Sequence, residues 1–148
     1  MAGKAAGAAR TRGENMELQI AALYAGLNAL VVAGLVFFVG RQRGRHGVGF
    51  GNGPEGGPVH LAIRAHANAV EFVPLTLVLL VILNVATPNN SLLLHWIGGA
   101  LTLGRLLHAF GLGRSAGTSF GRLAGTLLSM GALLAAAIGC LHYAITSL

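Results

Sequence analysis

Charged side chains are scarce in this chain: 9% of its 148 residues are Asp, Glu, Lys or Arg, and only 4 of those are acidic. A soluble domain carries about 25% charged residues, because its surface must face water. By contrast, 54% of the residues are hydrophobic. This composition excludes an ordinary water-soluble domain and predicts an integral membrane protein.

Cysteine is nearly absent as well. The single Cys140 cannot form an internal disulfide, and its place in the last apolar run fits a small packing residue. The formal net charge is +6, but the arginines flank apolar runs and do not form a long basic stretch with aromatics. No nucleic-acid partner is therefore expected.

Three runs contain no charged side chain, residues 18–40, 72–104 and 123–148. A membrane span needs about 20 apolar residues, so the first and last runs supply one span each. The middle run is too long for one span, and the turn sequence ATPNN interrupts it. The sequence therefore predicts an all-α membrane protein, a single four-transmembrane-helix bundle over residues 17–146, with helices at about 17–41, 59–85, 91–112 and 119–146.

Residues 1–16 are rich in Ala and Gly and are predicted to form a disordered tail. Their basic residues resemble the start of a signal peptide, but Glu14 and Glu17 interrupt them. The apolar run that follows also exceeds the ~7–15 residues of a signal core. The first helix is therefore expected to be retained.

Basic residues gather on one predicted side of the bundle. Seven of the ten lie after the first helix, at the start of the second, or around the third and fourth, namely Arg41, Arg43, Arg45, Arg64, Arg105, Arg114 and Arg122. Under the positive-inside rule this side is cytoplasmic, which places both termini on the non-cytoplasmic side of a multi-pass protein.

The first and second helices are joined by a glycine-rich connection, GRQRGRHGVGFGNGPEGGP. One interpretation is a flexible connector, and the other is a loop that faces a ligand. A nucleotide-binding phosphate loop is excluded, because no strand precedes the glycines and no Lys-Ser/Thr follows them.

The second helix carries a polar stripe in an otherwise oily stretch, RAHANAVEFVP. At about 100° per residue, Arg64, Asn68 and Glu71 fall on one face, and His60 extends that face toward the cytoplasm. Glu71 is expected near the middle of the bilayer, where a lone carboxylate costs about 2.5–3.5 kcal/mol. The stripe predicts either a functional site or a polar clamp between helices.

Further polar groups are expected at a similar depth. Arg105 and His108 lie near the cytoplasmic end of the third helix, and Arg122 begins the fourth. Together with the stripe they predict a pocket for an anionic ligand, in which Glu71 is available for an amine. No metal site is expected. Asn28 and His95, which interrupt other spans, are predicted to make contacts between helices or at the interface.

The sequence resembles the MAPEG family, the membrane-associated proteins in eicosanoid and glutathione metabolism. The resemblance rests on four spans, a basic loop after the first span, the motif Arg-x-x-x-Asn-x-x-Glu-x-x-Pro at residues 64–74 and the segment GRLLHAFG on the third helix. The resemblance covers residues 17–146 and is closest to the bacterial branch. It implies a homotrimer of four-helix bundles, surrounded by lipid in a bacterial inner membrane. It also implies that glutathione, as a co-substrate, binds on the cytoplasmic side between neighbouring subunits.

Carried over by the motifs, the resemblance implies a role for each site residue. Arg122 is implied to hold the glutathione thiolate, and the glutathione contacts are implied to be Arg43, Arg64, Asn68, Glu71, Arg105 and His108. The implied activity is a glutathione-dependent transferase or peroxidase acting on lipophilic electrophiles.

The tyrosines depart from the family pattern. Family enzymes that act on eicosanoids carry tyrosines near glutathione on the third and fourth helices, whereas Tyr24 and Tyr143, the only two here, are expected near the opposite membrane face. A second hypothesis therefore stays open: a non-catalytic membrane protein, either a small-molecule carrier or a structural trimer that keeps a glutathione-like site.

Overall fold

The computed structural model describes residues 18–87, 89–112 and 119–148. Within these ranges the chain forms four helices and no strand: α2 (Gln19–His46), α3 (Pro58–Ala86), α4 (Ser91–Leu112) and α5 (Phe120–Ser147). The all-helical prediction is confirmed. The predicted disordered tail, residues 1–16, and Arg114 lie outside the described residues.

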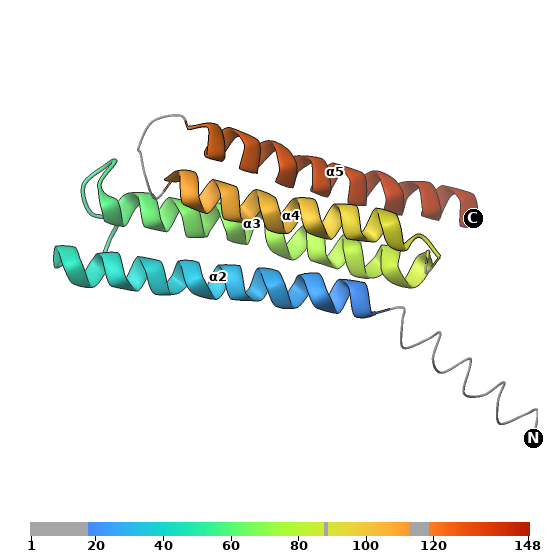
Figure 1. Ribbon diagram of the computed structural model, residues 1–148, viewed down its shortest axis with the longest axis horizontal. Coiled ribbons are helices and arrows are strands. Elements are labelled where there is room, and N and C mark those ends of the chain that lie inside the picture. Colours follow the sequence, from blue (N-terminus) through green and yellow to red (C-terminus); the bar gives the residue numbers. More distant parts are fainter. Residues whose placement is uncertain (1–17, 88, 113–118) are drawn as a thin grey trace, which may run out of the picture.

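The helices run antiparallel along one long axis (Figure 1). α3 and α4 lie in the middle, with α2 on one side of them and α5 on the other. The connection between α2 and α3 lies at the same end of the bundle as the end of α4 and the start of α5. This end therefore gathers the described arginines among those that the sequence predicts on one side of the membrane.

Three helices, α2, α3 and α5, are long and apolar enough to cross a membrane. Their surfaces carry large apolar side chains exposed to the surroundings, among them Leu30, Phe37 and Ile138. Such exposure suits a lipid environment. α4 has two histidines and an arginine in 22 residues and is not among the three; that it also crosses the membrane stays a prediction.

α2 continues past the predicted end at residue 41 and stops at His46. Two physical features explain the extension. Arg43, Arg45 and His46 lie in the last turn, where cations interact favourably with the helix dipole. Gly47 then adopts a left-handed conformation with φ 65°, and its N–H caps the helix at the carbonyl of Arg43.

The core lies between α3, α4 and α5, and the last two helices approach most closely at glycines. A Cβ on Gly125 would lie 2.5 Å from the carbonyl oxygen of Gly104 and 2.5 Å from the backbone nitrogen of His108. Small residues permit this backbone contact between membrane helices. Gly121 and Gly125 of α5 therefore both pack against α4 of the same chain.

Hydrogen bonds between polar side chains also connect α2 to α4 at two positions. Asn28 donates through Nδ2 to Thr102 Oγ1 at 2.8 Å, which joins α2 to α4. The Tyr24 hydroxyl is hydrogen-bonded to His95 Nδ1 at 3.0 Å, which joins the starts of the same two helices. The predicted contacts of Asn28 and His95 are confirmed.

Candidate functional site

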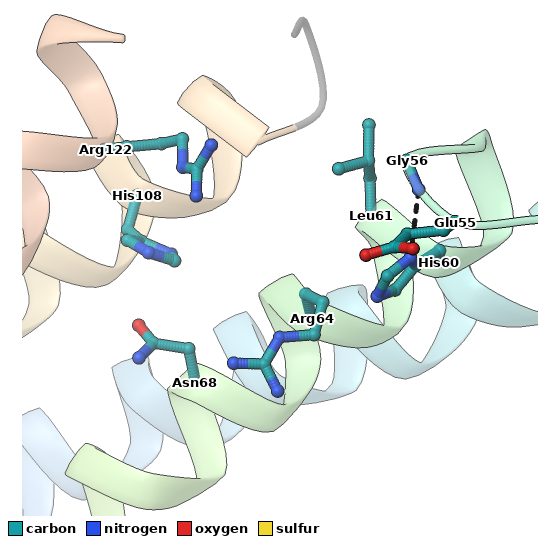
Figure 2. Close-up of a pocket in the computed structure, with 8 residues that line it drawn as sticks. All are labelled: Glu55, Gly56, His60, Leu61, Arg64, Asn68, His108 and Arg122. Atoms are coloured by element: carbon teal, nitrogen blue, oxygen red, sulfur yellow. Dashed lines mark hydrogen bonds between the residues drawn. The ribbon is translucent and has the colours of Figure 1, made fainter. Parts of the chain in front are cut away.

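A pocket of about 390 Å³ opens at the arginine-rich end of the bundle (Figure 2). The α2–α3 connection supplies two of its lining residues, α3 supplies four, and α4 and α5 supply one each. The lining residues are Glu55, Gly56, His60, Leu61, Arg64, Asn68, His108 and Arg122. The pocket thus brings together residues that are far apart in the sequence.

Four of the seven predicted site residues line this pocket: Arg64, Asn68, His108 and Arg122. Figure 2 shows Arg64 and Asn68 on successive turns of α3, with His108 and Arg122 facing them from α4 and α5. α5 begins beside the pocket, where the backbone N–H of Arg122 donates to the Ser119 hydroxyl at 3.4 Å. This cap positions the first turn of α5, which carries Arg122.

Arg105 lies behind the pocket and is not one of its lining residues. It is buried, with 1% of its surface exposed, and its guanidinium stacks 4.8 Å from the centroid of the Phe72 ring. Its donors reach Asn68 Oδ1 at 2.7 Å, the Ser129 hydroxyl at 2.8 Å and the Gly125 carbonyl at 3.2 Å. The structure therefore places Arg105 as a polar clamp that joins α3, α4 and α5.

Glu71 also lies outside the lining. It is exposed on α3, one turn beyond Asn68, whose Nδ2 donates to Glu71 Oε2 at 3.4 Å. The exposed residues Arg64, Leu75 and Ile82 fall on the same face of the helix. The predicted stripe therefore exists, but only the part nearer the arginine-rich end of the bundle lines the pocket.

Arg43 is engaged with the glycine-rich connection. Its guanidinium donates to the carbonyl of Val48 at 3.3 Å and to that of Gly51 at 2.8 Å. The residue therefore holds the loop in place at the end of α2, and it is not one of the lining residues.

Sequence reasoning missed Glu55, Gly56 and Leu61, and it placed His60 only on the stripe. One signal for Glu55 was available. It is the single acidic residue between positions 18 and 70, and it lies just before a helix that carries polar groups. The loop fold that brings it to the pocket leaves no periodic pattern in the sequence.

The pocket combines guanidinium groups with hydrogen-bonding side chains. Arg64 and Arg122 supply planar, permanently charged donors that suit carboxylates and thiolates. Asn68 and His108 add hydrogen-bonding capacity, and Glu55 adds one negative charge. Within the described ranges, no group of three or more His, Cys, Asp or Glu side chains lies together that could hold a metal ion. The lining suits an anionic, partly zwitterionic small molecule.

The fold and the pocket define an all-helical integral membrane protein with a basic site at one end of its bundle. Comparison with known sequences refines this class: the MAPEG family profile matches residues 21–142, and the chain belongs to the MAPEG family. The predicted family is confirmed.

The chain is similar to the inner membrane protein YecN of Escherichia coli (strain K12). The two are 36% identical over 92 residues, which cover 62% of this chain and 69% of the relative. The protein of the same name from Escherichia coli O6:H1 matches over the same extent and identity. Both relatives are bacterial proteins, which confirms the predicted resemblance to the bacterial branch of the family.

Proposed function

We propose that this protein is a glutathione-dependent transferase or peroxidase of the bacterial inner membrane that acts on lipophilic electrophiles. The observation that carries the proposal is the pocket in which Arg64 and Asn68 of α3 meet His108 of α4 and Arg122 of α5. Its volume of about 390 Å³ falls in the range of small-molecule sites, roughly 300–1,000 Å³. Glutathione, a small peptide with two carboxylates, an ammonium and a thiol, matches the mixed charges of this lining.

Arg122 is the residue proposed to activate the thiol. A free thiol has a pKa of about 8.5, and only its thiolate is a good nucleophile. A guanidinium stays charged at neutral pH, so its proximity favours the thiolate and lowers the pKa of the bound thiol. Each unit of lowering corresponds to about 1.4 kcal/mol.

The thiolate then attacks an electrophile that arrives from the lipid. With an aryl chloride, a carbon–sulfur bond forms, the carbon–chlorine bond breaks and chloride leaves. With a hydroperoxide, two glutathione molecules are oxidised to the disulfide while the hydroperoxide is reduced to an alcohol and water. Arg64 is proposed to bind a carboxylate of glutathione during either reaction.

A homotrimer is proposed as the working assembly. Glu71 is exposed on the surface of a single subunit, on the same face of α3 as the apolar side chains Leu75 and Ile82. A carboxylate that faces lipid near the bilayer centre is costly, so a second copy is expected to cover this face. Because Arg64 belongs to both this face and the pocket, glutathione would be bound between subunits.

The cytoplasm is the proposed location of the pocket. The described chain starts and ends at the opposite end of the bundle from the arginine-rich end. Because arginines concentrate in cytoplasmic loops, both termini are proposed to be non-cytoplasmic. Cytoplasmic glutathione would then reach the pocket directly.

The test is a conjugation assay on protein reconstituted in liposomes, with glutathione and a lipophilic aryl chloride. Product formation above the uncatalysed rate is expected for the wild type, as is its loss in Arg122→Ala. Reduction of a lipid hydroperoxide is measured in parallel. Wild-type rates equal to those of empty liposomes with both substrate classes would overturn the proposal.

A non-catalytic membrane protein is the second candidate, and two observations favour it. Arg105, which the family resemblance assigns to glutathione, is used in packing, and none of the eight described lining residues is a tyrosine. A small-molecule carrier would show proton-coupled transport that Glu71→Gln abolishes, without an effect of glutathione. A structural trimer would show altered assembly in Glu71→Gln and no ligand binding.

A further inference from the structure

A second cavity lies between α4 and α5, outside the arginine-rich pocket. It is a groove of about 560 Å³, to which α4 contributes four residues and α5 contributes six. None of these ten residues carries a charge, and Trp96 is the only one whose side chain holds a polar atom. None of them lines the arginine-rich pocket. The groove is therefore a separate apolar feature, and the proposed glutathione chemistry does not use it.

Small residues leave the groove open. Its lining includes Ala100 of α4 and Ala124, Gly131 and Ala135 of α5. A Cβ on Gly131 would meet nothing within 4 Å, so α5 leaves free space at this point. Trp96 borders the groove from α4, with 70% of its surface exposed. The groove is thus open to the surroundings of the bundle, with one large aromatic side chain beside it.

The dimensions of the groove suit a single hydrocarbon chain. Along α5 the lining runs from Ala124 to Ala135, which is about 16 Å at about 1.5 Å per residue. One leaflet of a bilayer supplies half of the hydrocarbon core, about 15 Å, so an acyl chain has a similar length. A further helix is too wide to enter between two packed helices, because their axes lie about 8–10 Å apart and a helix with its side chains is about 10–12 Å across. A chain of methylenes is narrow enough.

The surface around the groove is also of the kind that faces lipid. Two turns beyond Trp96, α4 exposes Leu103 on the same face. Two turns beyond Leu127, α5 exposes Leu134. The face of α3 that is proposed to meet a second copy differs, because it carries the exposed carboxylate of Glu71. The lining of the groove has no such charged group that would require cover by protein.

We propose that the α4–α5 groove binds one acyl chain of a membrane phospholipid. The chain lies along the two helices, and van der Waals contact with the lining stabilises it, since a lipid tail moves here from one apolar environment to another. The groove selects for a long chain and not for a headgroup, because its lining offers no charged partner to a phosphate. The proposal does not rest on the glutathione function.

Tryptophan fluorescence reports on this groove directly, because Trp96 is the only tryptophan in the chain. Detergent-purified full-length protein is titrated with phosphatidylglycerol whose acyl chains carry bromine, an atom that quenches tryptophan on contact. Quenching is expected to saturate as the lipid replaces detergent in the groove. Unbrominated phosphatidylglycerol of the same chain length should restore the fluorescence by competition, whereas phosphatidylglycerol with short acyl chains should not.

A groove-filling variant makes the result specific. In Gly131→Leu the lipid concentration at half-maximal quenching is expected to rise about tenfold, because on the order of ten atom–atom contacts with the chain are lost. Gly26→Leu is the matched control, since Gly26 is exposed on α2 and a Cβ there also meets nothing within 4 Å. Its titration should equal that of the wild type. An unchanged titration in Gly131→Leu, or an equal shift in both variants, would overturn the proposal.

Other occupants give different results, and each of these results would contradict the proposal. A second copy seated on the groove would shield Trp96 and abolish quenching. Lipid that only surrounds the protein would quench in proportion to its concentration, without saturation. A headgroup site would respond to the short-chain lipid as it does to the long-chain lipid. A groove that serves the lipophilic electrophile would release the brominated lipid to the aryl chloride, and Gly131→Leu would then slow conjugation.

Discussion

Arg105 Nη1 donates to Asn68 Oδ1 over 2.7 Å, which joins the buried part of α4 to a residue that lines the pocket. The bond determines the orientation of the amide. With its oxygen turned to Arg105, Asn68 directs its NH₂ group toward Glu71, at 3.4 Å from Oε2. Arg105 thus acts on the site through Asn68 while it clamps three helices together.

Replacement of this clamp should destabilise the bundle. Arg105→Leu leaves Asn68 Oδ1 without its charged partner and removes the bonds to Ser129 and Gly125, and we expect a loss of about 2 kcal/mol. Thermal unfolding in detergent measures the effect. Arg41→Leu, at an exposed position, is the control and should stay within about 0.5 kcal/mol. Equal stability of the two variants would show that the clamp is not structural.

The close approach of α4 and α5 gives a second prediction. In Gly125→Ala the new methyl group would meet the Gly104 carbonyl and the His108 backbone at 2.5 Å, so the helices must separate at a cost of about 1–3 kcal/mol. Gly131→Ala on the same helix meets nothing within 4 Å and is the matched control. The thermal midpoint of Gly125→Ala should fall well below that of Gly131→Ala, and a reversed order would contradict the packing.

Tyr24 should have no part in the chemistry. Its hydroxyl is hydrogen-bonded to His95 near the starts of α2 and α4, and these starts lie at the opposite end of the bundle from the pocket. Tyr24→Phe is therefore expected to keep both glutathione affinity and conjugation rate, within about twofold. Loss of the bond to His95 changes only stability, by about 1 kcal/mol. A large fall in conjugation rate would mean that a tyrosine takes part in the proposed chemistry after all.

Arg64 and Arg122 should have separable effects on glutathione. Arg64→Ala is expected to weaken binding about tenfold, because a charged hydrogen bond to a carboxylate is lost, and to leave the pKa of the bound thiol unchanged. Arg122→Ala is expected to raise that pKa by about one unit, toward the value of the free thiol. Calorimetry and a pH titration of the bound thiolate measure the two quantities. Identical effects of both variants would refute the division of roles.

Much of the fold could be predicted because membrane helices have a distinctive composition, long apolar runs without charged residues. Charge-free runs and one turn sequence located all four helices. The predicted bounds of the third helix, 91–112, are the same as those of α4 in the structure. The end of α2 is harder to predict, because the charge-free run stops at residue 40 and the predicted helix ends at residue 41, just before Arg43. The helix continues beyond Arg43 because its dipole favours cations in its last turns.

The site could be predicted only where it follows helical periodicity. The spacing of Arg64 and Asn68 identified the face of α3 that reaches the pocket, and the ends of the next two helices supplied His108 and Arg122. Periodicity could not tell that Arg105 points into the core, because burial depends on which neighbours surround each face. Nor could it place Glu55, whose position depends on a loop held by tertiary hydrogen bonds.

The ultraviolet absorbance of the thiolate, followed while detergent-purified protein is titrated with glutathione at neutral pH, tests the proposed function most directly. The expected result is a saturable thiolate band in the wild type that disappears in Arg122→Ala, although calorimetry still detects bound glutathione in that variant. A wild type that binds glutathione without forming the band, or an undiminished band in Arg122→Ala, would contradict thiolate stabilisation by Arg122.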